Sequence, residues 1–280
     1  MARPGLTARP PPCQTCPPMS LIFAGALFFY LAAASLTAAR LGDAGARARI
    51  GRAPVIVLAG LAVLLHLLGL ALEVRASGGV DLHFGNALSL VGLGMALVLA
   101  LAARRSALDP IGMLVYPIAA ACLLAALLSR PDTPAPRPES WQIALHGIIA
   151  LLAYSTLSVA SLVAILMAGQ EHALRSHRPL PFLHSLPLTL TEALLFQLIG
   201  AGFALLSLTL LSGLLFVDDL LAQHLVHKTV LSVAAWVVFG GLLLARLRLG
   251  LRGRRAAWLT LAGMVLLLVA YFGGMVLLAR

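Results

Sequence analysis

The stretch that decides the fold is Gln142–Ala168, which reads QIALHGIIALLAYSTLSVASLVAILMA and contains no Asp, Glu, Lys or Arg. A helix needs about 20 consecutive apolar residues to cross the hydrocarbon core of a bilayer. A soluble helix buries one apolar stripe and keeps a charged face for water, and this stretch has no such face. It therefore predicts a membrane-spanning helix.

Seven further apolar stretches of similar length accompany it. Of the 280 residues, 61% are hydrophobic and only 11% are charged, whereas about 25% of the residues of a soluble domain are charged. Because the backbone polar groups of a spanning segment must bond within the protein, we expect an all-α, polytopic transmembrane helical bundle of about eight helices. The predicted spans are Leu21–Ala39, Pro54–Leu72, Asn86–Ala103, Pro110–Leu128, Gln142–Ala168, Ala193–Val217, Lys228–Ala245 and Ala257–Leu278.

The third and fourth of these spans are separated only by a short segment that includes Arg104 and Arg105. Taken as one, they would form about 40 apolar residues, which is twice the length of a span. We therefore expect two helices here.

Basic residues cluster in alternate loops. Thirteen of the 20 Lys and Arg residues fall in the first, third, fifth and seventh loops, and the other seven fall in the remaining loops and the two tails. Because basic loops favour the cytoplasm, both termini are predicted on the outer, periplasmic side of a bacterial inner membrane. Positive charges follow the first apolar run, at Arg40 and Arg47, so this run is predicted to stay as a helix and not to be cleaved as a signal peptide.

The first 18 residues differ from the rest of the chain. They are rich in proline, and an apolar run begins near Met19, so we expect a disordered tail or a misplaced start at residues 1–18 and a single transmembrane domain at residues 19–280. Cys13 and Cys16 form one CxxC pair, which suits either a redox pair or half of a zinc site. The net charge is +10, but the arginines lie between apolar runs and form no basic face with aromatic residues. Binding to nucleic acid is therefore not expected.

Three histidines on three different helices are predicted in the outer half of the membrane: His66, His146 and His227. Neutral imidazole is a common ligand of haem iron and of transition metals, and helix bundles build such sites from ligands on separate helices. The alternative is a structural role, because an intramembrane histidine can also hydrogen-bond a neighbouring helix. His227, at the start of a helix, can also be solvated. The residue pattern leaves these readings open.

Sequence features of common enzymes are missing. Asp218 and Asp219 are adjacent in a loop and are not placed as a pair for acid–base catalysis. The chain has no glycine-rich phosphate loop after a strand and no GxSxG or HExxH motif. We therefore predict a protein that is not an enzyme.

Several stretches in this order and spacing resemble the cytochrome c assembly family of membrane proteins, which includes CcsA, CcmC and HemX-like proteins. The first has a histidine at the outer end of a helix and a tyrosine eight residues later, here His146 and Tyr154. The chain is similar in particular to the YpjD-type inner-membrane subgroup, and the resemblance extends from Met19 to the end of the chain. The matching stretches are Asn86–Leu90 (NALSL), Leu145–Leu166, Leu190–Phe216, His227–Gly240 and Leu251–Gly274.

This resemblance implies a haem site. In the haem-handling relatives, the histidine that matches His146 is an axial haem ligand on the outer side. Those relatives also carry a tryptophan-rich outer segment that ends in WDPKE, of which this chain keeps only Lys228 and Trp236 in register. Their later histidine falls near Leu244, which cannot bind iron. The second ligand would then come from His227 or His66.

The leading hypothesis is an inner-membrane protein that binds haem b and takes part in cytochrome c-type biogenesis as a non-catalytic scaffold. The haem iron would be held by His146 and His227, with His66 as the other possible partner of His146. Tyr154 and Trp236 complete the predicted cofactor-binding set. The expected partners are the lipid bilayer, haem and other cytochrome c maturation proteins.

The alternative is an accessory membrane protein without haem, linked to tolerance of divalent cations (magnesium or cobalt) or to the regulation of haem synthesis. His66, Glu73 and the outer histidines would then contact a hydrated metal ion or stabilise helix packing.

Overall fold

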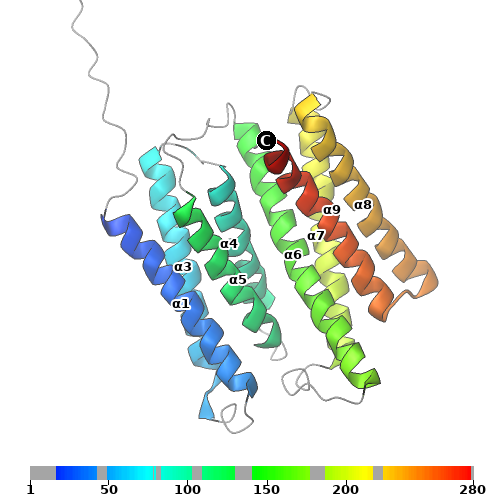
Figure 1. Ribbon diagram of the computed structural model, residues 1–280, viewed down its shortest axis with the longest axis horizontal. Helices are drawn as coiled ribbons and strands as arrows, with labels where there is room; N and C mark the ends of the chain where they lie inside the picture. Colours follow the sequence, from blue (N-terminus) through cyan, green and yellow to red (C-terminus); the bar gives the residue numbers. More distant parts are fainter. Residues whose placement is uncertain are drawn as a thin grey trace, which may run out of the picture.

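The computed structural model of the chain describes residues 17–42, 49–77, 79, 83–102, 109–129, 141–176, 187–216 and 223–278. Within these ranges it contains eight helices and no strand, and all eight are long and apolar enough to cross a membrane. The prediction of eight helices, with two in place of one long segment at the third and fourth spans, is confirmed. The helices, labelled in Figure 1, are α1 (Pro17–Gly42), α3 (Arg52–Ser77), α4 (Phe84–Ala102), α5 (Asp109–Leu128), α6 (Trp141–Arg175), α7 (Leu188–Phe216), α8 (Gln223–Leu249) and α9 (Gly253–Leu278).

Each helix differs from its predicted span at one end or at both ends. α1 begins at Pro17, inside the predicted tail, while residues 1–16, which include Cys13 and Cys16, lie outside the described residues. α6 continues from Ala168 to Arg175. Its last turns are polar, so they lie beyond the apolar run from which the span was predicted. There Glu171 pairs with Arg175 one turn later, at 2.6 Å, and such pairs stabilise an exposed helix end.

The helices form two groups of four that lie side by side (Figure 1). In the first group α1 packs against α3 and α5, and α4 packs against α5. In the second group α6 packs against α7 and α9, and α8 packs against the same two helices. The two groups meet mainly where α4 contacts α6.

Two glycines bring α4 close to its neighbours on both sides. A Cβ atom at Gly92 would lie 3.2 Å from the Cα atom of Ala119 in α5. A Cβ atom at Gly94 would lie 2.7 Å from the Cβ atom of Ser155 in α6. Since side chains do not tolerate such separations, a larger residue at either position would push a helix away. These glycines therefore help α4 to join the two groups.

One end of the bundle, where α1, α4, α6 and α8 end and α3, α5, α7 and α9 begin, is named here the arginine-rich end. In the first group, Asp109 lies 3.1 Å from Arg40 and 3.2 Å from Arg52. In the second group, Glu192 pairs in the same way with two arginines. These ion pairs join helix ends whose charges predict the cytoplasmic side. The side of the membrane that this end faces stays a prediction from the loop charges.

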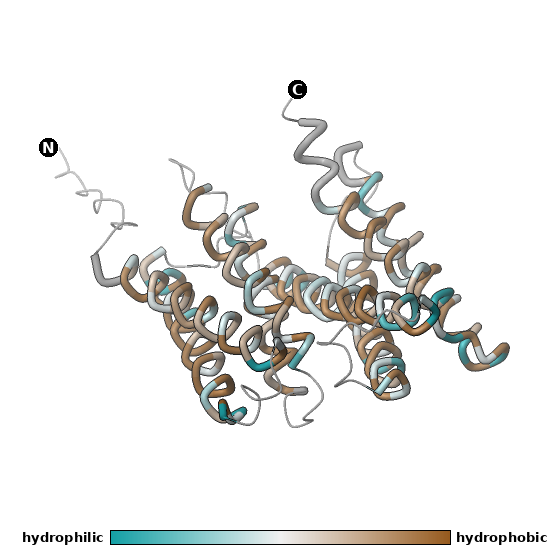
Figure 2. Tube along the Cα trace, turned by 60° about the horizontal axis from the view of Figure 1, so that its bottom comes forward, coloured by the Kyte–Doolittle hydropathy of each residue, from teal (hydrophilic) through white to brown (hydrophobic). Residues whose placement is uncertain are grey.

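The outward faces of the helices are covered by apolar side chains. Leu31, Leu64 and Leu214 are each at least half exposed, on three different helices. Most of each described helix has the colour of hydrophobic residues in Figure 2. Contact of such a surface with water is unfavourable, whereas lipid acyl chains can cover it. The bundle is therefore a multi-pass membrane protein.

Candidate functional site

His66 is enclosed within the first group and has no exposed surface. Its Nε2 atom lies 2.7 Å from the hydroxyl of Ser89 in α4, and its Nδ1 atom lies 3.4 Å from the hydroxyl of Tyr30 in α1. The ring of Phe23 packs edge-on against the imidazole. Both ring nitrogens thus face hydroxyl groups, and the side chain links α3 to α1 and α4.

The depth of His66 also differs from the prediction. α3 continues to Ser77, so His66 lies about 16 Å from that end at the usual rise of a helix. This is near the middle of the span, deeper than the position expected from the shorter predicted segment.

His146 lies near the other end of the second group, on the face of α6 that packs against α7. Its Nδ1 atom lies 2.9 Å from the hydroxyl of Ser212, and that hydroxyl donates to the carbonyl of Thr209 at 3.0 Å. A serine hydroxyl has one proton to donate. When that proton goes to Thr209, Nδ1 of His146 is the donor and Nε2 carries a lone pair. Histidines that bind metals are held in this way by a hydrogen bond at the second nitrogen.

The absence of a side chain at Gly213 makes room for this imidazole. A Cβ atom there would lie 3.2 Å from Cε1 of His146, which is closer than an ordinary van der Waals contact. Gly213 and Ser212, adjacent on α7, together position the ring. His146 is half-buried, in contrast to His66.

His227 lies in the first turns of α8, at the same end of the second group as His146. Its Nε2 atom is buried and has no hydrogen-bond partner among the described residues. Trp236 follows nine residues later, which is two and a half turns and therefore the opposite face of α8. Trp236 stacks on Phe203 of α7 at 5.4 Å between ring centroids and donates from Nε1 to Ser207 at 2.8 Å. His227 thus lies on the face of α8 turned away from these α7 residues.

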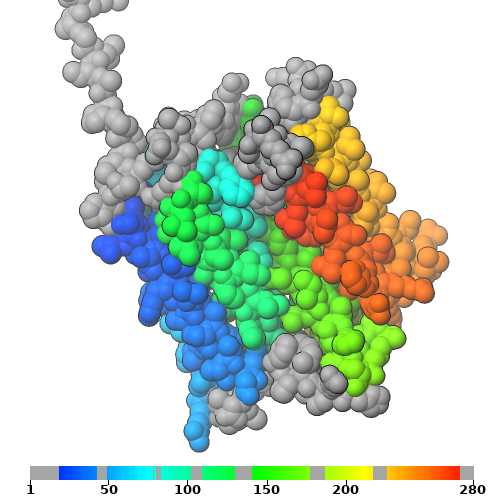
Figure 3. All heavy atoms as spheres, viewed as in Figure 1, coloured from blue at the N-terminus to red at the C-terminus, as the bar shows by residue number. Residues whose placement is uncertain are grey.

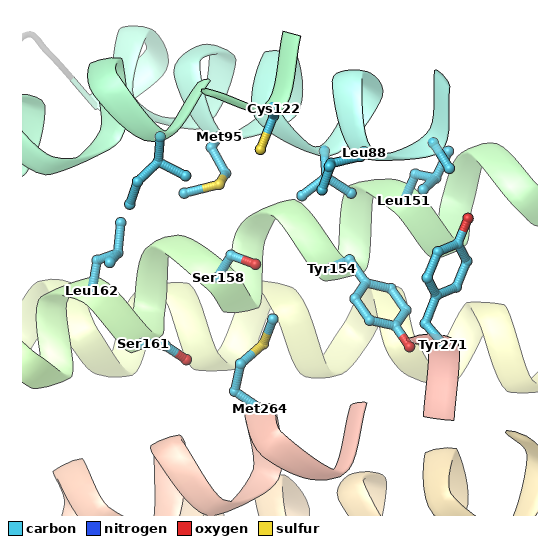
Figure 4. A pocket seen from close by; sticks show the side chains of 13 residues that line it. Leu88, Met95, Cys122, Leu151, Tyr154, Ser158, Ser161, Leu162, Met264 and Tyr271 are labelled. Atoms are coloured by element: carbon cyan, nitrogen blue, oxygen red, sulfur yellow. The ribbon is translucent and has the colours of Figure 1, made fainter. Parts of the chain in front are cut away.

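Tyr154 lines a cavity of about 240 Å³ between the two groups. The cavity lies among α4, α5, α6 and α9, and most of its lining is apolar, with Met95, Cys122 and Met264 adding sulfur atoms (Figure 4). The hydroxyl of Tyr154 donates to the carbonyl of Leu267 at 2.7 Å, and its ring packs against Tyr271. The sequence motif that pairs Tyr154 with His146 thus spans two sites, with the tyrosine facing the cavity and the histidine facing α7.

The five predicted cofactor-binding residues therefore occupy separate places. His66 is in the first group, Tyr154 is at the junction of the groups, and His146, His227 and Trp236 are in the second group. None of the described contacts joins one of the three histidines to another. Among the described residues, no group of three or more His, Cys, Asp and Glu side chains could hold a metal ion.

The family model described as cytochrome C assembly protein matches residues 55–279. The chain belongs to the cytochrome c assembly protein family. The match runs from the first turn of α3 to the end of α9, so it includes all five predicted site residues and leaves out α1. The resemblance found in the sequence is confirmed.

Among individual relatives, the inner membrane protein YpjD of Escherichia coli (strain K12) is 32% identical over 79% of this chain and 85% of its own length. The cytochrome c biogenesis protein CcsA of Synechococcus sp. (strain RCC307) is 28% identical over 56% of this chain and 60% of its own length. CcsA of Guillardia theta is 26% identical over 58% of this chain and 62% of its own length. No solved structure matches the chain. With eight spans and the likeness to YpjD, this family member is a multi-pass inner membrane protein.

Sequence reasoning missed the residues that hold the histidines. Ser212 is one of several serines on apolar helices, and nothing in its neighbourhood marks it as the partner of His146. Ser89 had a clearer signal, because it lies within the NALSL element at Asn86–Leu90 that carried part of the family resemblance. Its contact with His66 gives that element a structural role.

Proposed function

We propose that this chain binds haem through His146 and acts in cytochrome c biogenesis. The observation that carries the proposal is the hydrogen bond between Nδ1 of His146 and the hydroxyl of Ser212. With the proton of that hydroxyl donated to Thr209, Nδ1 is the donor and Nε2 keeps the lone pair that an axial ligand donates to iron. His146 is half-buried near one end of the second group, so part of its side chain is accessible.

For the second axial ligand we propose His227 in preference to His66. The Nε2 atom of His227 is buried and has no hydrogen-bond partner among the described residues, a costly state that ligation would relieve. Each ring nitrogen of His66 already contacts a hydroxyl group, so either one would have to give up that contact before it could bind iron. His146 and His227 also belong to the same group of helices, whereas His66 does not.

The proposed role is that of a scaffold without turnover. Haem bound here would supply a redox-active iron, while the protein contributes two neutral imidazoles and a surrounding of low polarity. Three carboxylates of the described residues, Asp109, Glu171 and Glu192, are each paired with arginine at the arginine-rich end. They lie at the opposite end of the bundle from His146, so they are not placed to exchange protons with a ligand there. Glu73 lies near the other end of α3, but α3 belongs to the first group.

Family membership supports a place in cytochrome c biogenesis. The CcsA proteins of Synechococcus and Guillardia theta carry this function in their names, and the same family model spans α3 to α9 of this chain. The binding of haem b, and the handing of haem to other maturation proteins, are proposals that extend this likeness.

The test is an absorption spectrum of the purified protein in detergent after haemin is added. We expect a Soret band for the native protein, loss of that band in His146→Ala, and an altered spectrum in His227→Ala. His172→Ala is the matched control, because His172 is an exposed histidine at the arginine-rich end of α6. We expect it to behave as the native protein does.

Two outcomes would overturn the proposal. One is the absence of a Soret band in every sample, which would favour a membrane protein without haem. The other is a band that survives unchanged when both His146 and His227 are replaced.

A further inference from the structure

An open groove of about 990 Å³ lies at the arginine-rich end of the second group. It is formed where α6 and α8 end and where α7 and α9 begin. Gly250 and Gly253 make this shape possible, since both adopt positive φ angles, 64° and 62°, in the short turn between α8 and α9. Figure 3 shows the first turns of α9 beside α8 on this side of the molecule.

The groove carries an excess of positive charge. Its lining includes four arginines but only two carboxylates, Glu171 and Glu192. Both carboxylates are already engaged, Glu171 with Arg175 at 2.6 Å and Glu192 with Arg246 and, at 3.6 Å, Arg252. Arg254 and Arg255 are exposed at the start of α9.

The positive charge in the groove that no carboxylate balances comes from Arg254 and Arg255. Among the residues that the structure describes, neither guanidinium pairs with a carboxylate. Arg252, at 69% exposure, is bound to Glu192 only at the edge of the ion-pair distance. An anion in the groove would therefore meet two guanidinium groups with no internal partner to displace.

The rim of the same groove is apolar and faces the surroundings of the bundle. Trp258 is 61% exposed, Leu174 is 65% exposed and Leu249 is 80% exposed. Trp258 lies about 8 Å along α9 from its first residue, and tryptophan is enriched at the interface between lipid and water. The groove thus offers guanidinium groups for a charged head beside apolar side chains for a hydrocarbon tail.

We propose that this groove binds the phosphate headgroup of an anionic membrane lipid. Arginine suits a phosphate because its planar guanidinium donates two parallel hydrogen bonds. Basic pockets between spanning helices on the cytoplasmic side are a known way to hold anionic lipids. A free phosphate would use the same arginines but would gain nothing from Trp258 and the two leucines, so the apolar rim favours the lipid.

The experiment measures lipid retention by the full chain purified in detergent, using native mass spectrometry. Phosphatidylglycerol is the anionic probe, and phosphatidylcholine with the same acyl chains is the neutral one. We expect the native protein to retain phosphatidylglycerol preferentially, and the double variant Arg254→Ala/Arg255→Ala to lose about tenfold in apparent affinity. Inorganic phosphate at the same concentration is expected not to displace the lipid.

The matched control is the double variant Arg49→Ala/Arg248→Ala. It removes the same charge from exposed positions that do not line the groove, and it should bind lipid as the native protein does. A thermal unfolding curve in detergent establishes that both variants are folded. If either variant is unfolded, both are replaced by the milder glutamine variants, Arg254→Gln/Arg255→Gln and Arg49→Gln/Arg248→Gln.

Three results would overturn the proposal. They are equal retention of the two lipids by the native protein, equal loss of affinity in both double variants, and displacement of the lipid by an equal concentration of inorganic phosphate. The last result would identify a free anion as the ligand. Because none of these measurements involves haem, their outcome is independent of the proposed site at His146.

Discussion

The two groups of helices use similar polar residues to different effect. Each group holds a histidine beside a serine hydroxyl within the membrane, His66 with Ser89 and His146 with Ser212. Each also holds one carboxylate between two arginines at the arginine-rich end. The difference between the groups is how far these residues are enclosed.

In the first group the histidine and one arginine are enclosed, whereas Arg52 is 29% exposed. His66 has no exposed surface and Arg40 is 5% exposed. In the second group His146 is half-buried, and Arg252 is 69% exposed. The hydrogen-bonding atoms of an enclosed polar group are already bonded to protein partners. Such a group can hold helices together, but few of its atoms remain free to bind a ligand. We therefore expect the first group to serve as structure, and both proposed ligand sites lie in the second group.

The largest expected difference between the groups comes from their carboxylates. Asp109→Ala leaves Arg40 buried without a counter-charge, and we expect it to lower the free energy of unfolding by about 3–5 kcal/mol. Glu192→Ala leaves Arg246, which is 26% exposed, and Arg252, which is 69% exposed, without their carboxylate. Because neither arginine is as enclosed as Arg40, we expect a loss of about 1 kcal/mol or less. Unfolding by SDS in mixed micelles, followed by circular dichroism, measures both. Equal losses of unfolding free energy in the two variants would contradict the proposed difference between the first and second groups of helices.

The two histidines should give opposite results in two measurements. His66→Ala creates a cavity and leaves the hydroxyls of Tyr30 and Ser89 without their partner, so we expect it to cost about 3 kcal/mol of unfolding free energy. Its Soret band should be unchanged. His146→Ala should cost about 1 kcal/mol or less, because one exchangeable hydrogen bond is lost, yet it should remove the Soret band. The contrast fails if His66→Ala removes the band and His146→Ala retains it.

A smaller effect is expected from the hydroxyl that orients His146. Ser212→Ala removes the partner of Nδ1 but keeps the imidazole, so haem should still bind, with affinity reduced about tenfold. Ser207→Ala, on the same helix, removes a hydroxyl that faces Trp236 instead, and should leave haem affinity unchanged. Titration of each variant with haemin measures the difference. Equal affinity in Ser212→Ala and the native protein would show that the hydroxyl does not support a ligand.

The smallest effect is expected from Trp236. Trp236→Phe keeps an aromatic ring to stack on Phe203 but loses the hydrogen bond to Ser207, so we expect a loss of about 0.6 kcal/mol of unfolding free energy. Because Trp236 faces α7 and lies on the opposite side of α8 from His227, we expect the Soret band to be unchanged. A weakened band would instead assign Trp236 to the haem site, as the family resemblance implies.

The helices were predictable because the signal for each of them is local. A run such as Gln142–Ala168 must be helical in lipid whatever surrounds it, because only its own backbone can satisfy its polar groups. The boundaries were less predictable. α6 extends to Arg175 because its last turns are polar and continue past the apolar run, which hydropathy does not detect.

The candidate site was predictable only in part. The type and position of His146 and His227 marked them as possible ligands, and the family resemblance supported the first. Their partners were not predictable, because Ser212 lies 66 positions from His146 along the chain and resembles other serines in apolar helices. Asp109 is a similar case, since it reads as an ordinary residue at a helix start until α5 is packed against α1 and Asp109 meets Arg52 at the start of α3.

The amino-acid sequence by itself determined that this protein is a bundle of eight spanning helices, and its charges predict which end faces the cytoplasm. Both follow from the transfer of residues between water and lipid, which depends on composition along the chain and not on neighbours in space. Tertiary structure alone decided which histidine is enclosed and which is half-buried, and which arginines have no carboxylate partner among the described residues. Those properties depend on the packing of one helix against another, so they appear only when the two groups of helices are assembled.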